Sequence, residues 1–189
     1  MRMPRPPPPA GAGGEWTAHP QGLNHAVELV RLIRGISRFT VGVAAFPDRH
    51  PESPDLDHDA RVLVAKAEAG ADFAITQFFF DPAAYFSLVE RLSALGCTIP
   101  VIPGIMPVTN IKQVERFAQL SGAPLPAGVV KRLEAVRDDP AGVRRVGVEL
   151  ATELSAQLLG GGAPGLHFYT LNRSTATLEV FADLGAAVR

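Results

Sequence analysis

The fold is decided by the stretch FAITQFFFDPAAYFSLVERLSALGCTIPVI at residues 73–102. Its first residues form a short apolar run that ends on the polar Gln77, which is typical of a buried strand. Asp81, followed by a proline, is a favourable N-cap for a helix, and Gly96 is well suited to end that helix. A second apolar run follows at 99–102. The stretch therefore predicts a strand–helix–strand unit.

The same pattern extends in both directions along the chain. Upstream, we expect a helix around Val27 and Val30, a strand at 39–45, and a second helix that is capped by Ser53 and ended by Gly70. Downstream, the expected elements are a helix after Asn110, helices near 127–137 and 140–159, a strand at 166–170 and a closing helix at 172–184.

Short apolar strands that alternate with helices predict a parallel sheet, because parallel strands need long crossover connections. Polar residues follow the expected strands, and in α/β folds that edge binds ligands. They are His50, Gln77, Thr109, Asn110, Asn172 and Arg173. A closed barrel has eight βα units and about 250 residues. This chain supplies four units, so the fold class is α/β of the (β/α)8 TIM-barrel type, present as a half-barrel.

Composition narrows the functional classes. Of 189 residues, 47% are hydrophobic, which supports a substantial core, and the net charge of −1 gives no reason to expect a nucleic-acid partner. Cys97 is the single cysteine, which favours a reducing, cytoplasmic location. No stretch approaches the roughly 18 apolar residues of a membrane span. Residues 1–16, rich in Pro and Gly, are expected to be a disordered tail, and 17–189 the globular domain.

Three positions leave alternatives open when they are read by chemistry alone. His50, in a proline-stiffened segment with Phe46, either binds a ligand or caps a turn. Asp59 and Lys66 share a helix face, and their spacing alone favours two solvated charges. The amide of Gln77 needs hydrogen-bond partners, which either a planar ligand or the neighbouring backbone could provide.

Several motifs in order resemble the methylenetetrahydrofolate reductase family. They are VAAFP at 43–47, HPE at 50–52, AGAD at 69–72, AITQFFFD at 74–81, IPGIMP at 102–107 and HFYTLNR at 167–173. The resemblance covers about 15–184 and corresponds to the C-terminal half of the family's barrel. It implies an oxidoreductase that uses FAD, with NADH or NADPH as hydride donor, to reduce 5,10-methylenetetrahydrofolate to 5-methyltetrahydrofolate in one-carbon metabolism and methionine biosynthesis.

The resemblance also implies site residues. The positions that match flavin contacts are Ala26, Phe46, His50, Ser53, Asp59, Val62, Ala65 and Lys66. The positions that match folate or nicotinamide contacts are Gln77, Gln113, Phe117 and Arg173. No metal is expected. No catalytic residue is assigned, because the family's catalytic glutamate belongs to the first half of the barrel, and Pro7 stands where the family has a flavin-tuning aspartate.

Three interpretations follow from the half-barrel. The chain is a truncated reductase that is inactive alone, or one half of a split enzyme whose other half is a second chain, or a non-catalytic flavin- or folate-binding remnant. The open half-barrel also leads us to expect self-association into a homo-oligomer.

Overall fold

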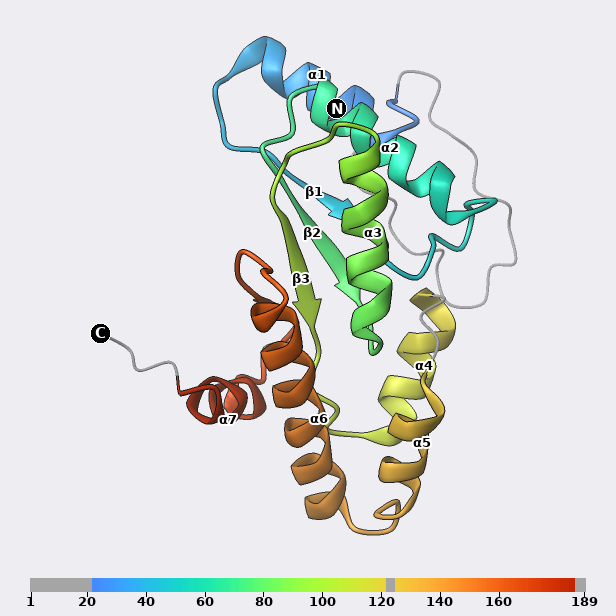
Figure 1. The fold of residues 1–189 in the computed structure, drawn as a ribbon, viewed down its shortest axis with the longest axis vertical. Helices are drawn as coiled ribbons and strands as arrows, with labels where there is room; N and C mark the ends of the chain where they lie inside the picture. Colours follow the sequence, from blue (N-terminus) through green and yellow to red (C-terminus); the bar gives the residue numbers. More distant parts are fainter. Residues whose placement is uncertain (1–21, 122–124, 186–189) are drawn as a thin grey trace.

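The computed structural model describes residues 22–121 and 125–185, so the expected tail at 1–16 lies outside the described residues. Four strands form one sheet: β1 (Gly42–Ala45), β2 (Phe73–Phe78), β3 (Val101–Ile105) and β4 (His167–Phe168). Their order in space follows the chain and every pairing is parallel. Figure 1 shows β1, β2 and β3 side by side. The expected parallel α/β sheet is confirmed.

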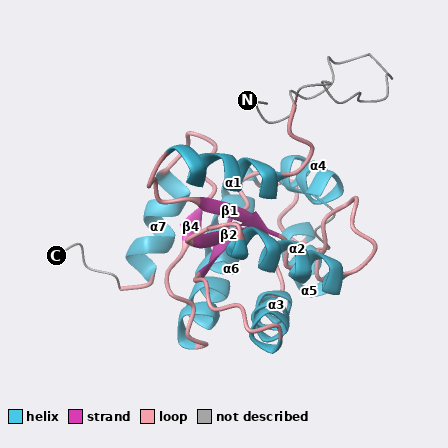
Figure 2. Ribbon diagram, turned by 90° about the horizontal axis from the view of Figure 1, so that it is seen from above, coloured by secondary structure: helices cyan, strands magenta, loops and turns pink. Residues whose placement is uncertain are grey.

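The helices form a layer against this sheet. They are α1 (Ala26–Ile36), α2 (Leu56–Glu68), α3 (Pro82–Ala94), α4 (Ile111–Ser121), α5 (Ala127–Glu134), α6 (Pro140–Gly160) and α7 (Thr175–Asp183). Helices α1, α2, α3, α6 and α7 contact one another in that order, and α5 packs on α6 (Figure 2). A curved row of helices outside a parallel sheet is half of a (β/α)8 barrel. Within the described residues, no helix is both long and apolar enough to cross a bilayer.

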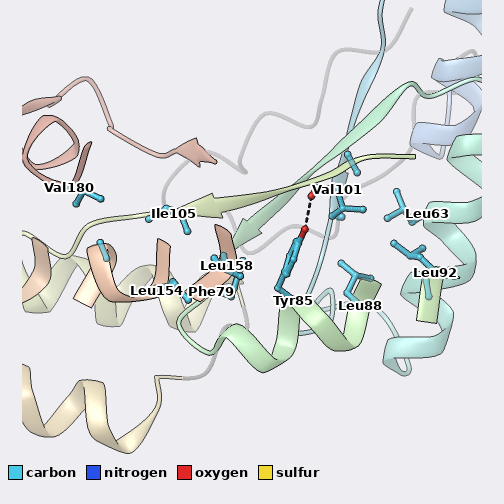
Figure 3. Packing of buried hydrophobic residues seen from close by; sticks show 14 of the residues in the cluster. Leu63, Phe79, Tyr85, Leu88, Leu92, Val101, Ile105, Leu154, Leu158 and Val180 are labelled. Atoms are coloured by element: carbon cyan, nitrogen blue, oxygen red, sulfur yellow. Dashed lines mark hydrogen bonds between the residues drawn. The ribbon is translucent and has the colours of Figure 1, made fainter. Parts of the chain in front are cut away.

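The main core lies between the sheet and the helix layer (Figure 3). Leu63 of α2, Leu88 of α3 and Leu158 of α6 pack there against strand residues such as Ile105. The hydroxyl of Tyr85 donates a hydrogen bond of 2.9 Å to the carbonyl of Val101, which satisfies both buried groups. A second cluster joins the loop after β3 to α4, α5 and α6.

Two expected boundaries were wrong in the first half of the chain. The strand expected from 39 begins at Gly42, since Phe39 is 69% exposed and its carbonyl accepts a hydrogen bond from Arg34. Ser53 is not the cap of α2; the cap is Asp55, whose carboxylate accepts from the His58 amide at 2.6 Å. The Asp55 carboxylate lies directly before the helix and can reach its free amides, whereas the Ser53 hydroxyl donates to the Asp55 carbonyl.

Two boundaries also differ near the C-terminus. The strand expected at 166–170 contains only His167 and Phe168. The closing helix begins at Thr175 instead of 172, because Leu171 and Asn172 have φ values of 49° and 62°, which a right-handed helix cannot contain. The chain turns sharply here, directly after the last strand.

Candidate functional site

The loop after β1 brings an aromatic ring and an imidazole together, as the sequence predicted. The rings of Phe46 and His50 lie edge to face, with centroids 4.6 Å apart. The amide of Glu52 donates to Nδ1 of His50 at 3.1 Å, so His50 does cap a turn. In the neutral imidazole the proton is therefore on Nε2, which can donate to a ligand. The two interpretations of His50 are compatible, because each uses a different nitrogen.

Asp59 and Lys66 connect α2 to β1 and its loop. The Asp59 carboxylate accepts a hydrogen bond of 2.9 Å from the backbone amide of His50. Lys66 is only 8% exposed, and its ammonium donates to the carbonyl of Ala44 at 2.9 Å. Burial lowers the pKa of Lys66, while the charge of Asp59 acts in the opposite direction. Lys66 is therefore a buried cation and not the solvated charge that spacing alone favoured.

The Ala44 carbonyl, which accepts from Lys66, lies on the side of β1 that faces away from β2. The carbonyl of Val41 accepts from the Asp72 amide, so it faces β2. Carbonyls alternate in direction along a strand, and that of Ala44 consequently faces away from β2. Lys66 thus satisfies one backbone acceptor on the edge of β1, which has no further strand beside it in the described residues.

The other positions that were expected to contact the flavin differ in how close they lie to Asp59 and Lys66. Val62 and Ala65 lie on α2 with Asp59 and Lys66. Ser53 is buried, and its hydroxyl already donates to the carbonyl of Asp55 at 3.0 Å. Ala26 is the exposed first residue of α1, and only the general contact of α1 with α2 connects it to Asp59 and Lys66.

Gln77 lies in an irregular part of β2. Ile75 pairs with Ile102, but Phe78 pairs with Gly104, so β2 has one extra residue over this interval. Such a bulge interrupts the side-chain alternation and re-aims a side chain. The side-chain oxygen of Gln77, Oε1, accepts from the Phe78 backbone amide at 3.1 Å, so the neighbouring backbone does provide a partner for this oxygen. The Gln77 amide nitrogen has no hydrogen-bond partner among the described residues.

Asp48, which lies in the loop between Phe46 and His50, was not among the predicted site residues. One of its carboxyl oxygens is buried and has no hydrogen-bond partner within the described part of the chain. Burial raises the pKa of Asp48 to about 6, and the charge of Asp81 acts in the same direction. Both aspartates follow neighbouring parallel strands, so their positions in the sequence could have indicated that their carboxyls approach each other.

A cavity of about 530 Å³ lies where β3 and β4 end. Residues from both strand exits, α6 and the start of α7 line it, and Thr109, Asn110, Tyr169 and Arg173 supply polar groups. Arg173 was expected to be on the substrate side, and the structure places it on this wall. Gln113 and Phe117 belong to α4, but their side chains lie outside the described residues.

Comparisons with known proteins agree with one another. A family model described as methylenetetrahydrofolate reductase matches residues 6–185. The 5,10-methylenetetrahydrofolate reductase of Escherichia coli is 36% identical over 161 residues, which is 85% of this chain and 54% of that protein. Methylenetetrahydrofolate reductase 1 of Schizosaccharomyces pombe is 37% identical over 173 residues, 90% of this chain and 29% of its own length. The chain thus spans about half, or less, of these relatives.

A solved structure has the same fold. A Clostridium thermocellum protein, described as binding two copies of 5-methyl-5,6,7,8-tetrahydrofolic acid, superimposes with a TM-score of 0.53. The match covers 82% of this chain and 56% of that one, at 16% sequence identity. At this identity the likeness supports the barrel-type fold alone.

Proposed function

The chain belongs to the methylenetetrahydrofolate reductase family, and from this we propose that it is the flavin- and folate-binding half of an enzyme that reduces 5,10-methylenetetrahydrofolate to 5-methyltetrahydrofolate. The observation that carries the proposal lies at the carboxyl end of β1, where the His50 amide donates to Asp59 and the nearby Lys66 ammonium donates to the Ala44 carbonyl. The carboxyl ends of the strands are where α/β barrels bind their ligands.

His50, Asp59 and Lys66 suit FAD. Lys66 is a desolvated cation whose charge Asp59 balances only in part, and such a group suits a phosphate. Asp59 can also accept from sugar hydroxyls, and Nε2 of His50 can donate to an oxygen. The Phe46 ring, next to His50, offers an apolar surface. When bound, the flavin supplies hydride transfer from NADH or NADPH to the substrate.

The folate side of the site would lie at β2, β3 and β4. The Phe78 amide holds the side-chain oxygen of Gln77, and the two N–H donors of its amide have no partner among the described residues. Arg173, on the wall of the cavity, suits an anionic group of the substrate or the phosphates of the nicotinamide dinucleotide. Together, these groups would orient the pterin relative to the cofactor, since productive hydride transfer depends on close positioning.

Turnover requires more than these residues. The curated relatives are about twice as long as the matched segment or longer, and the family's catalytic glutamate has no counterpart assigned here. We therefore propose that four further βα units, on the same polypeptide or on a second chain, complete the active enzyme. We also expect this enzyme to act in the cytoplasm, in methionine biosynthesis. A remnant that binds flavin without catalysis is the alternative.

A flavin titration tests the proposal. Purified chain should quench the fluorescence of FAD with saturable binding, and Lys66→Met should weaken that binding at least tenfold. Lys131→Met, which changes an exposed lysine on α5, is the matched control and should bind FAD normally. Adding the first half of a related reductase as a separate polypeptide should then give NAD(P)H-dependent reduction of methylenetetrahydrofolate.

Two results would argue against this function. If FAD bound neither to the chain nor to its mixture with the complementary half, the flavin site would be refuted. If the mixture bound FAD but produced no 5-methyltetrahydrofolate, the remnant interpretation would replace the reductase. Turnover by the isolated chain would show that this chain itself supplies a catalytic acid.

A further inference from the structure

Two side-chain hydroxyls hold the backbone of the bulge that carries Gln77. The hydroxyl of Tyr169, directly after β4, donates a hydrogen bond of 2.8 Å to the carbonyl of Thr76. The hydroxyl of Thr76 accepts from the Gly104 amide, also at 2.8 Å. These bonds occupy the interval where the regular pairing of β2 with β3 is interrupted. The peptide unit that enters Gln77 is therefore held by β3 and by the residue after β4.

Gly104 makes the hydrogen bond from Tyr169 to Thr76 possible. Tyr169 must extend over β3 to reach β2, and a Cβ atom on Gly104 would lie 2.6 Å from Cε2 of the tyrosine ring and overlap the Thr76 carbonyl oxygen. Real Cβ atoms are not found so close to other atoms, so a side chain at this position would displace the ring or the strand. Burial also raises the pKa of the Tyr169 phenol, which keeps its proton available for donation.

We propose that Tyr169 is a positioning residue for the folate-binding amide of Gln77: its hydroxyl fixes the Thr76–Gln77 peptide, and through it the direction of the two amide donors. The proposal rests on the proposed function, since Gln77 is there a substrate contact. The chain of contacts runs from the Tyr169 hydroxyl to the Thr76 carbonyl, along the bulge to Gln77, and back from the side-chain oxygen of Gln77 to the Phe78 amide.

Tyr85 provides a matched control for the loss of one phenol. Its hydroxyl also donates to a strand carbonyl, that of Val101 at 2.9 Å, but in the core between the sheet and the helices (Figure 3). Tyr169→Phe and Tyr85→Phe both remove one hydroxyl and leave one strand carbonyl without its donor. Only Tyr169→Phe should alter the presentation of Gln77.

The first experiment measures the binding of 5-methyltetrahydrofolate to the full chain by calorimetry. We expect Tyr169→Phe to weaken binding about five- to tenfold, the effect of losing one ordering hydrogen bond, and Tyr85→Phe to leave it unchanged. In a Gln77→Ala background, Tyr169→Phe should weaken binding less than about twofold further, because the residue through which it acts is gone. An undiminished further loss would mean that Tyr169 contacts the ligand directly and would overturn the proposal.

The second experiment needs no ligand. In ¹⁵N NMR spectra of the free chain, the side-chain amide signals of Gln77, identified by their absence in Gln77→Ala, should shift and broaden in Tyr169→Phe but not in Tyr85→Phe. Thr76→Ser, which keeps the hydroxyl, should preserve them, and Thr76→Val should not. Unchanged signals in Tyr169→Phe would refute positioning. If the wild-type chain failed to bind 5-methyltetrahydrofolate, the proposed substrate site would fail, and these spectra would still decide whether Tyr169 orients Gln77.

Discussion

Gly147 of α6 lies directly against the backbone of Val108, so closely that a methyl group on Gly147 would overlap the Val108 carbonyl oxygen. Val108 follows β3 and lines the cavity that also contains Arg173. The absence of a side chain at Gly147 therefore lets α6 support the loop that forms one wall of the candidate substrate site. A helix position that looks unfavourable by propensity is required by packing.

This contact predicts opposite effects for two helical glycines. Gly147→Ala should destabilise the chain by about 1–3 kcal/mol, because the helix or the loop must move to admit the methyl group. Gly128→Ala, in α5 with open space around it, should be neutral or stabilise the chain by up to about 1 kcal/mol. Urea unfolding followed by circular dichroism measures both. Equal stabilities for the two variants would contradict the close approach of α6 to Val108.

Asp48 predicts a pH-dependent stability. Its folded-state pKa of about 6 lies above the ordinary 3.8, so the ionised carboxylate is disfavoured in the folded state, and stability falls as pH rises from about 4 to about 6. For a fully buried group the shift would correspond to about 3 kcal/mol. Because Asp48 is partly open to water, we expect Asp48→Asn to stabilise the chain by about 1–2 kcal/mol above pH 7 and very little at pH 4.

Urea unfolding at several pH values tests this expectation for Asp48. Asp183→Asn, an exposed change on α7, is the control and should leave the pH profile of stability as it is in the wild type. A stabilisation by Asp48→Asn that is the same at pH 4 and pH 8 would show that the effect does not arise from ionisation.

The proposed flavin contacts of Asp59 and Lys66 predict which substitutions weaken FAD binding most. Lys66→Ala and Asp59→Ala should weaken FAD binding tenfold or more, since a charge-assisted hydrogen bond is worth about 1.5–3 kcal/mol. Gln77→Ala should change FAD affinity much less, because Gln77 lies on β2 and is proposed to contact the folate. Flavin fluorescence titration gives the three affinities. Three equal losses would refute the division into a flavin side and a folate side.

The open edge of β1 predicts self-association. Exposed strand edges invite pairing between chains, and Ile36 and Phe39, which precede β1, are 74% and 69% exposed. The wild-type chain should therefore show a mass that increases with concentration in light scattering after size exclusion, and a double change of both residues to Lys should reduce this. Leu95→Lys, after α3, is the control. A cleanly melting wild-type monomer would contradict the expectation.

The sequence by itself determined the local elements of this protein. The apolar run before Gln77 became a parallel strand, and the run expected at 99–102 did so with a shift to 101–105. Asp81 capped α3 as expected, because a capping carboxylate and its amide lie within a few residues of each other. Gly70 and Gly96 ended their helices with φ values of 110° and 73°, a conformation that side chains resist. The motifs also identified the family, since they depend only on the order of residues.

Only the tertiary structure decided how the site residues are held. The bond from Tyr169 to Thr76 joins residues 93 positions apart, and the burial of Lys66 depends on α2 packing beside β1. The raised pKa of Asp48 likewise results from its burial and from the charge of Asp81, which follows the neighbouring strand. Hydrogen-bond partners and the cost of burying a charge depend on distance in space, and a pattern of neighbouring residues does not contain that distance.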